Sequence, residues 1–424
     1  MPSYEKNIDS IVRKLEKNLS PQFLDNLCQS TGLIQRQRKY AGHVLFWSVL
    51  GGFCLGNAPE IAGMLRAFNQ DTGLDIQYNA FYKRLQKPGF AVLMKQACHH
   101  LLNHLHTDNP FLQPWLLGNF RDIFIQDGSS FALNDLLQDL YPGRFTHNAP
   151  AAVELHVFHS LRNAVPQSVT LAPDSVSEYQ FMPTAENIDL ANTLSLFDRG
   201  YGSIPRLHLI EEAGGFFICR MRTNTNPRIL SASSSSETDS RKLFQNVSLK
   251  KKRDYEFLVR FENHEHIFKH LRLIALWNPA SKKHVLLLTN TDQAVLDLAA
   301  IGRLYRLRWQ IELLFKELKS HTELRKFLTA NEHIAEGFIW AAFCALIIRR
   351  FLLASAQSLS GRKLSFHKAA ISARSFIPQF ITCALSQFEK LRQCLKKIFA
   401  FLTQNMFFSN SRRPCALQRA GLIL

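Results

Sequence analysis

Hydrophobic residues recur with a helical period along the first quarter of the chain. In residues 5–115 apolar positions repeat every three or four residues, most clearly in segments 11–19 and 90–105. This spacing is typical of amphipathic helices. Turn-forming pairs such as Gly56 and Asn57 separate the periodic segments. The pattern therefore predicts a compact helical unit over residues 1–115.

Two short segments of this unit have the outline of a helix-turn-helix. Residues 59–66 form the first expected helix, and residues 80–87 form the second, with Asn79 as its N-cap. The second segment carries Lys83 and Arg84, whose charges suit contacts with phosphate groups. An ordinary basic helix that faces solvent explains the same pattern, so both interpretations stay open.

From about residue 119 the period shortens to that of β-strands. Runs of β-type residues predict strands at 120–127, 151–161, 165–173, 194–198, 215–222, 254–261, 272–277 and 284–290. Helices are expected at 179–192 and 204–214, a long helix from about 296, and helices throughout the chain after 335. Strands that alternate with helices predict an α/β fold.

These changes in hydrophobic period and composition divide the chain into five expected units. They are a helical domain over 1–115, a first α/β part over 116–222, a β-rich insertion over 223–290, a second α/β part over 291–350, and a basic helical region over 351–424. The insertion begins with a polar, Ser-rich segment at 223–240.

Nothing in the hydrophobic pattern indicates a membrane protein. The longest apolar runs, 44–56 and 338–348, are shorter than the roughly 18 residues that a membrane span needs, so they are expected as core helices. The first residues are charged and amphipathic rather than apolar, which argues against a secretion signal. The eight cysteines have no CxxC spacing, which fits a reducing cytoplasm.

Composition adds a strong positive charge to this picture. The chain of 424 residues has a net charge of +17 and is 46% hydrophobic, so it can bury a core and still attract a polyanion. Residues 1–115 carry twelve Lys and Arg against eight acids, and residues 351–424 carry eleven against one. DNA is the expected partner, with an anionic membrane second, whereas chance clustering of surface charge is the alternative.

The central part of the chain contains three acids that suggest chemistry. Asp127 and Asp198 each close a hydrophobic β-type run, and strand ends are where α/β proteins present ligand groups. On a helical wheel that begins at Tyr305, the side chains of Arg308, Glu312 and Lys319 fall within a stripe about 60° wide. Two aspartates and a glutamate can hold two divalent cations. A simple ladder of i,i+4 ion pairs is the alternative for the helical stripe.

The same residues carry a resemblance to a known family. Tyr305, Arg308, Glu312 and Lys319 are separated by two, three and six residues, and this spacing resembles the YREK signature of DDE transposases of the insertion sequence 4 family. The segments QDGSSFAL and LFDRGYGS resemble the segments of that family that hold its first and second catalytic aspartates.

The resemblance implies a fold and an activity. The fold would be an RNase H-like catalytic core with a β-rich insertion, flanked by helical N- and C-terminal domains. The activity would be cut-and-paste transposition, in which Mg²⁺, or Mn²⁺ in its place, is held by Asp127, Asp198 and Glu312. Arg308, Lys319 and Tyr305 would grip phosphates beside the scissile bond.

The flanking regions and one tryptophan receive roles from the same resemblance. Residues 1–115, with their basic segment 36–39, would bind the terminal inverted repeats of the element. The C-terminal region would supply the contacts of a homodimer in a synaptic complex, through leucines and an isoleucine at helical spacing: Leu391, Leu395, Ile398 and Leu402. As an alternative, the basic groups of this region could bind DNA in trans. Trp277 is the candidate for stabilising a flipped base, although its apolar neighbours favour a core position.

Two other functions remain as alternatives. The chain could be a DNA-binding repressor or architectural protein derived from a transposase, without cleavage activity. It could also be a nuclease that cleaves DNA without joining strands. The intact acids and the intact helical stripe favour the transposase.

Overall fold

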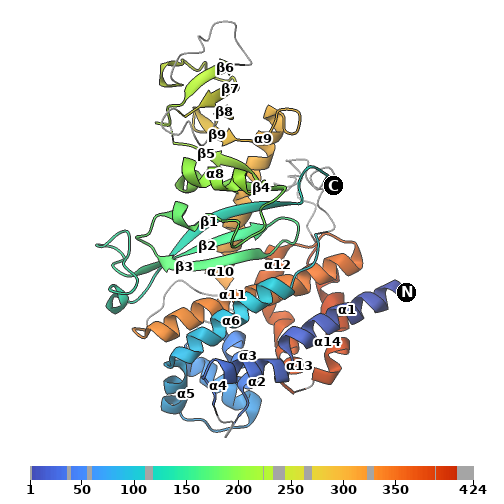
Figure 1. Ribbon diagram of the computed structural model, residues 1–424. Helices are drawn as coiled ribbons and strands as arrows, with labels where there is room; N and C mark the ends of the chain where they lie inside the picture. The colour runs from blue at the N-terminus through green and yellow to red at the C-terminus, as the bar shows by residue number, and fades with distance from the viewer. Residues whose placement is uncertain are drawn as a thin grey trace.

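The computed structural model describes residues 2–35, 40–54, 60–109, 118–222, 224–232, 244–261, 270–321, 329–386 and 388–407. The described residues form a β-sheet and a layer of helices packed below it in the view of Figure 1. Helices from both ends of the chain make up that layer. Strands and helices together agree with the α/β class predicted from the sequence, whereas the five domain boundaries stay a prediction.

The described strands form one nine-stranded sheet in the order β3-β2-β1-β4-β5-β9-β8-β7-β6. Strand β1 pairs in parallel with β4, and β4 pairs in parallel with β5, whereas β2 and β3 run antiparallel beside β1. The bounds are β1 Asp122–Ala132, β2 Ala152–Ser160, β3 Pro166–Pro173, β4 Thr193–Phe197, β5 Phe216–Arg220, β6 Arg228–Ala232, β7 Tyr255–Arg260, β8 Leu271–Asn278 and β9 Lys283–Thr289.

The expected β-rich insertion continues this sheet. Strand β9 pairs with β5, and β8, β7 and β6 follow in order to the sheet's far edge. Strand β6, at 228–232, falls in the Ser-rich segment where no strand was predicted. Its pairing partner β7 supplies the hydrogen bonds that its own sequence pattern did not indicate.

The two faces of the sheet are covered differently, because side chains alternate along each strand. Ile123 and Ile125 of β1 belong to the large core that the helices share, whereas Phe124 belongs to a second core on the opposite face. Helix α8 (Ile204–Glu212) covers that second face and buries Ile204, Leu207 and Ile210 there. Polar residues on β1 therefore face one layer or the other according to their parity.

The helical layer combines the first and last parts of the chain. Its long central helix is α11 (Glu332–Ser360), which packs against α6, α3 and α14. The other members are α1 Pro2–Leu19, α2 Pro21–Ser30, α3 Gly42–Cys54, α4 Ile61–Thr72, α5 Tyr78–Leu85, α6 Pro88–His104, α12 Phe366–Ile371, α13 Ile377–Ser386 and α14 Leu391–Asn405. By length and composition α11 could cross a membrane, yet its apolar window is entirely buried inside the protein, as expected of a core helix.

The prediction that the C-terminal helix supplies dimer contacts through its apolar stripe is wrong. The four side chains of that stripe are buried in the chain's own core, each 1% exposed or less: Leu391, Leu395, Ile398 and Leu402. Helix α14 packs on α11, α13 and α1, and Arg392 and Lys396 form ion pairs with Glu5 of α1. The helical spacing of these four residues therefore marks the side of α14 that packs inside the same chain.

Three predicted helices have different bounds in the structure. Residues 179–192 contain only a 3₁₀ turn, η2 (Glu178–Phe181), because Pro183 has no amide hydrogen to continue a helix. The long helix expected from 296 is α9 (Leu298–Tyr305), a 3₁₀ turn η6 (Arg306–Arg308) and α10 (Trp309–His321). Helix α5 begins one residue after Gln77, which occupies the N-cap position predicted for Asn79.

Candidate active site

Asp127 and Asp198 lie side by side at one point of the sheet. The parallel pairing of β1 with β4 ends at Gln126 opposite Phe197, so the next residue on each strand is an aspartate. Strand β1 continues past Asp127 to Ala132 in its pairing with β2. Asp127 therefore lies within a strand, whereas the sequence pattern predicted that it ends one. The two aspartates are neighbours because each directly follows the last residue pair of β1 and β4.

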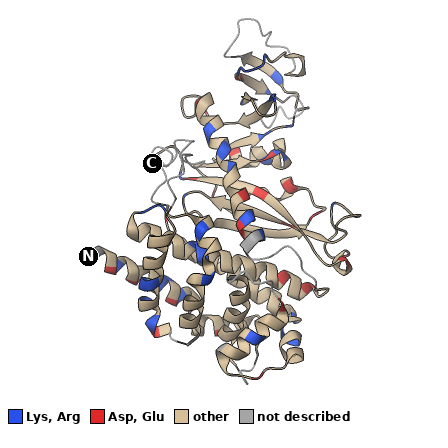
Figure 2. Ribbon diagram, turned by 180° about the vertical axis from the view of Figure 1, so that it is seen from behind, with Lys and Arg blue, Asp and Glu red and all other residues tan. Residues whose placement is uncertain are grey.

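Both aspartates point to the face that α10 covers. Asp127 is two residues from Ile125, and Asp198 is two residues from Leu196, and both apolar residues belong to the core shared with the helices. Helix α10 packs against β1 on this face. Figure 2 shows acidic positions of the sheet next to basic positions of the helix that crosses it.

Arg308 joins the first aspartate to the glutamate of α10. Its Nη1 donates to Asp127 Oδ2 at 2.6 Å, and its Nη2 donates to Glu312 Oε1 at 2.7 Å. The arginine side chain is only 9% exposed, so few waters compete for these bonds. The predicted i,i+4 pair between Arg308 and Glu312 exists, but the same guanidinium also reaches a residue 181 positions away.

Two further side chains contact the second aspartate. The Tyr305 hydroxyl donates to Asp198 Oδ1 at 3.3 Å, and Arg220 of β5 lies 3.7 Å from the same oxygen. The sequence analysis missed Arg220, because only the pairing of β4 with β5 brings it to this position. Asp198 therefore has one hydrogen-bond donor and one cation beside it.

The electrostatics of the site leave negative charge incompletely compensated. Burial, with smaller contributions from the nearby Asp198 and Glu312, raises the pKa of Asp127 to about 6 against the opposing effect of Arg308. Burial also raises the pKa of the Tyr305 phenol, and the adjacent Asp198 adds to the shift. Tyr305 is thus a neutral donor, and the carboxylates favour an added cation.

The donor set suits a hard divalent cation, although another group now occupies the position between two of the acids. All three candidate ligands are carboxylates, which Mg²⁺ and Mn²⁺ prefer. Among the described residues no three acidic, histidine or cysteine side chains stand close enough together to hold a metal ion as they are. The Arg308 guanidinium lies between Asp127 and Glu312 and compensates part of their negative charge. The residues fit a metal in charge and chemistry, provided that Arg308 moves aside.

The last residue of the helical stripe contacts the end of β1, and the outer side of α10 carries exposed apolar residues. The Lys319 ammonium lies 4.8 Å from the centre of the Phe131 ring, at the end of β1 beyond Asp127. Trp309, which directly follows Arg308, is 63% exposed, and Leu313 is 56% exposed. Exposed apolar side chains of this size are surfaces on which a base or sugar can pack. Sequence reasoning missed both residues, because it assigned α10 only a buried face and a charged stripe.

The other predicted contact residues lie elsewhere in the molecule. Lys83 is exposed on α5, and Arg84 donates to the Leu33 carbonyl at 2.8 Å, far from β1 in Figure 1. The basic segment 36–39 is outside the described residues. Trp277 of β8 is half-buried, with its ring edge-on to that of His284 at 5.2 Å. Their predicted roles in DNA binding stay predictions.

The amino-acid sequence of the chain is similar to those of known proteins. Residues 118–348 match the family model described as the transposase DDE domain. The transposase for insertion sequence element IS231F of Bacillus thuringiensis subsp. israelensis is 19% identical, covering 95% of this chain and 93% of the relative. The transposase for insertion sequence element IS1151 of Clostridium perfringens is 20% identical, over 84% of this chain and 82% of the relative.

Proposed function

Because the matched domain spans more than half of its residues, the chain belongs to the family with the transposase DDE domain, and we propose that it is an insertion-sequence transposase that cleaves and joins DNA strands. The family implies an RNase H-like core, with which the mixed sheet is compatible. The YREK spacing supports membership of the insertion sequence 4 group. DNA is the substrate that the name of the family implies.

The observation that carries the proposal is the meeting of two distant sequence motifs at Arg308. Asp127, from the first motif, and Glu312, from the second, bind the same guanidinium at 2.6 and 2.7 Å. Tyr305, also from the second motif, contacts Asp198. A residual scaffold that only binds DNA has no need for two aspartates at the sheet and a glutamate on the helix that crosses it.

In the proposed mechanism the three carboxylates hold Mg²⁺, with Mn²⁺ as a substitute. The bound ions would supply Lewis acidity toward the attacking and leaving oxygens of the phosphodiester. Asp127 and Asp198 are held on adjacent strands, and Glu312 on α10, so their relative positions are set by the sheet and one helix. A rigid arrangement of this kind avoids reorganisation during the reaction.

Arg308 has two successive partners in this mechanism. In the described structure it bridges Asp127 and Glu312. With those carboxylates holding cations instead, its guanidinium would be available for a bidentate contact with a DNA phosphate. Tyr305 remains a neutral donor beside Asp198, and Lys319 adds positive charge at the other end of the same helix. Phosphate contacts would fix the DNA backbone in line with the acids.

The wider partners belong to the same proposal. Double-stranded DNA with the element's terminal inverted repeats would contact the N-terminal helices, including Lys83 and Arg84 on α5. Two copies of the chain would meet in a synaptic complex, through surfaces other than the buried face of α14. The reaction would take place in the bacterial cytoplasm, where the chromosome is accessible.

The test is a strand-cleavage and strand-joining assay on duplex DNA that carries the element's own ends, with and without Mg²⁺. We expect the wild type to cleave only with Mg²⁺ or Mn²⁺. Asp127→Asn and Glu312→Gln should each lower the rate by at least about 100-fold, because each ligand supports several kcal/mol of charge stabilisation in the transition state. Asp135→Asn, which changes an exposed acid just beyond β1, is the matched control and should cleave as the wild type does.

Two outcomes would contradict the proposal. A wild-type protein that binds the ends but never cleaves, like Asp127→Asn, would be a DNA-binding descendant of a transposase. Cleavage without joined products would indicate a nuclease.

A further inference from the structure

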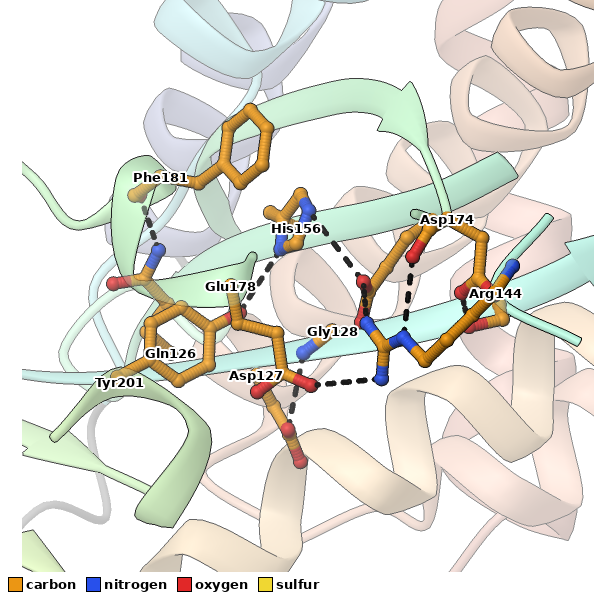
Figure 3. A network of polar contacts seen from close by, with 11 residues as sticks. Gln126, Asp127, Gly128, Arg144, His156, Asp174, Glu178, Phe181 and Tyr201 are labelled. Carbon is orange, nitrogen blue, oxygen red and sulfur yellow. Dashed lines mark hydrogen bonds and ion pairs between the residues drawn. The ribbon is translucent and has the colours of Figure 1, made fainter. Parts of the chain in front are cut away.

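A buried polar network lies on the face of the sheet opposite the candidate active site. Gly128 follows Asp127 on β1, so whatever packs over Gly128 is on the other side of the strand. There Gly128 is opposite His156 of β2, and Ser130 is opposite Glu154. Figure 3 shows the network from close by, with Arg144 near its centre.

Arg144 connects three acidic residues from three segments. Its Nη2 donates to Glu154 Oε2 at 3.1 Å, and its Nη1 lies 3.6 Å from Glu178 Oε1. Its Nε donates to the Asp174 carbonyl at 3.2 Å, and its backbone amide donates to Asp174 Oδ2 at 3.1 Å. Asp174 also accepts the Ser130 hydroxyl of β1. The guanidinium is therefore oriented by several contacts.

Two of these carboxylates rest against the glycines that follow the candidate catalytic aspartates. A Cβ atom at position 128 would overlap Glu154 Oε1, and one at position 200 would overlap Glu178 Oε2. Gly128 directly follows Asp127, and Gly200 is two residues after Asp198. The absence of a side chain at each position lets a carboxylate approach the backbone closely.

A second set of contacts ties the same backbone segments together. The Tyr201 hydroxyl, next to Gly200, lies 3.1 Å from His156 Nδ1 on β2. The His156 ring stacks on Phe181 at 4.0 Å between centres, and Gln126 of β1 donates to the Phe181 carbonyl at 2.6 Å. Turn η2, which contains Glu178 and Phe181, is thus held between β1, β2 and the turn after β4.

The cluster requires the charge of Arg144. Burial raises the pKa of Glu154 to about 7, and the neighbouring Glu178 contributes to that shift, whereas Arg144 opposes it. Burial lowers the pKa of His156 to about 4, so the imidazole is neutral and cannot take the place of the guanidinium. Without Arg144, Glu154 and Glu178 would lose the guanidinium that they share, and with it the contacts that hold both carboxylates over the two glycines.

We propose that Arg144 is a positioning residue for the two catalytic aspartates. By holding Glu154 against Gly128 and Glu178 against Gly200, its guanidinium fixes the backbone of β1 relative to the turn after β4. The side chains of Asp127 and Asp198 project from these two backbone segments toward α10. Arg144 thereby sets the separation of two metal ligands from the back of the sheet, and this inference rests on the proposed function.

The experiment measures single-turnover cleavage of duplex DNA with the element's own ends, over a range of Mg²⁺ concentrations. Arg144→Met should lower the rate at saturating DNA and Mg²⁺ by about 10- to 100-fold, because misplacement of a reacting group by about 1 Å has effects of this size. The Mg²⁺ concentration for half-maximal rate should rise at least about fivefold, whereas the Kd for DNA should stay within a factor of two. Arg144→Lys keeps the positive charge but not the planar, two-pronged guanidinium. Its cleavage rate and its Mg²⁺ dependence should lie between those of the wild type and those of Arg144→Met.

Two other variants distinguish a loss of positioning from a general loss of stability. Arg121→Met changes a similarly exposed arginine, which directly precedes β1, pairs with Asp189 before β4 and is remote from both glycines. It should match the wild type in rate and Mg²⁺ dependence. Glu178→Gln keeps the side chain over Gly200 without its charge, and should shift the Mg²⁺ dependence in the same direction by a smaller factor. If Arg144→Met unfolds, this variant decides the question.

Two results would overturn the inference. One is a wild-type Mg²⁺ dependence in Arg144→Met and Glu178→Gln. The other is a loss in Arg144→Met that weaker DNA binding explains in full, since Arg144 is 42% exposed and would then be a DNA contact. Binding of Mn²⁺ to the protein without DNA, followed by electron paramagnetic resonance, gives a readout independent of cleavage. If the wild type binds Mn²⁺ more tightly than Arg144→Met but never cleaves, the proposed function fails and the positioning role stands.

Discussion

At the scale of single residues, Arg308 shows how one side chain can serve two states of a site. Its guanidinium bridges Asp127 and Glu312, which come from different elements and carry the negative charge that a divalent cation would need. The arginine side chain is mostly buried, whereas Glu312 is 40% exposed. A cation held by these two carboxylates would compete with this arginine for the same oxygens.

The raised pKa of Asp127 predicts how stability depends on pH in the absence of metal. The protonated form favours folding, so this contribution is complete below the ordinary pKa of 3.8 and is lost as the pH rises through about 6. Asp127→Asn is neutral at every pH and should raise the free energy of unfolding at pH 7.5 by about 1–3 kcal/mol, since two pKa units correspond to about 3 kcal/mol.

Urea unfolding in the presence of EDTA at pH 4, 6 and 7.5 checks this prediction. The difference between the variant and the wild type should vanish near pH 4 and grow with pH. Asp135→Asn, at an exposed position, should show no such trend. An Asp127→Asn protein that is less stable than the wild type at pH 7.5 would contradict the assigned environment.

At the scale of elements, α10 is held on both sides. Glu312 faces the aspartates, whereas Glu317, on the opposite side of the helix, binds two arginines of α11. Glu317 Oε1 accepts from Arg349 at 2.6 Å, and Glu317 Oε2 accepts from Arg350 at 2.9 Å. Arg350 also donates to the Ala164 carbonyl beside the sheet. These bonds fix the rotation of α10 between the sheet and the helical layer.

Removal of Glu317 should be costly. Glu317→Leu leaves two buried guanidinium groups without their carboxylate, and the free energy of unfolding should fall by about 3–5 kcal/mol. The triple variant Glu317→Leu, Arg349→Met, Arg350→Met removes all three charges and should recover most of that loss.

Urea denaturation of both variants tests this expectation. Arg392→Met, which breaks half-exposed pairs with Glu5 and Asp9, is the comparison and should cost under about 1 kcal/mol. If Glu317→Leu costs no more than Arg392→Met, the ion pairs do not hold α10.

Helix α14 gives a second prediction at this scale. Leu395 is fully buried in the chain's own core, so Leu395→Ala should lower the free energy of unfolding by about 2–5 kcal/mol. Its oligomeric state, measured by sedimentation at a temperature where it is folded, should equal that of the wild type. A variant of unchanged stability that dissociates from a dimer would restore the dimer interpretation of this stripe.

At the scale of the whole molecule, the net charge of +17 predicts that association with DNA is electrostatic. Each phosphate contact by Lys or Arg releases a counterion, so affinity for duplex DNA should fall by at least about 100-fold between 50 and 200 mM salt. Lys83→Gln should reduce the slope of log Kd against log salt by about one if α5 contacts a phosphate.

Fluorescence anisotropy with a labelled duplex measures both quantities. Lys282→Gln, at an exposed position in the turn between β8 and β9, is the control for Lys83→Gln. Equal slopes for the two variants and the wild type would exclude Lys83 as a phosphate contact. Affinity that is insensitive to salt would exclude electrostatic binding altogether.

The sequence by itself determined the local elements and the identity of the candidate acids. Strand period, helix period and the fixed spacing of Tyr305, Arg308, Glu312 and Lys319 depend on neighbours within a few residues, so they could be predicted. The strands β2 to β5 and β7 to β9 lie close to where their patterns indicated, whereas β1 continues five residues beyond its predicted end to Ala132. The assumption of one straight helix from 305 to 319 was wrong, because a 3₁₀ turn interrupts it.

Only the tertiary structure decided which residues meet. Arg308 is 181 positions from Asp127, and Tyr305 is 107 from Asp198, and no local pattern specifies such contacts. The same holds for Arg144 behind the sheet and for the burial of α14 against α1. An amphipathic stripe shows that a face is covered, but the packing of the whole chain determines what covers it.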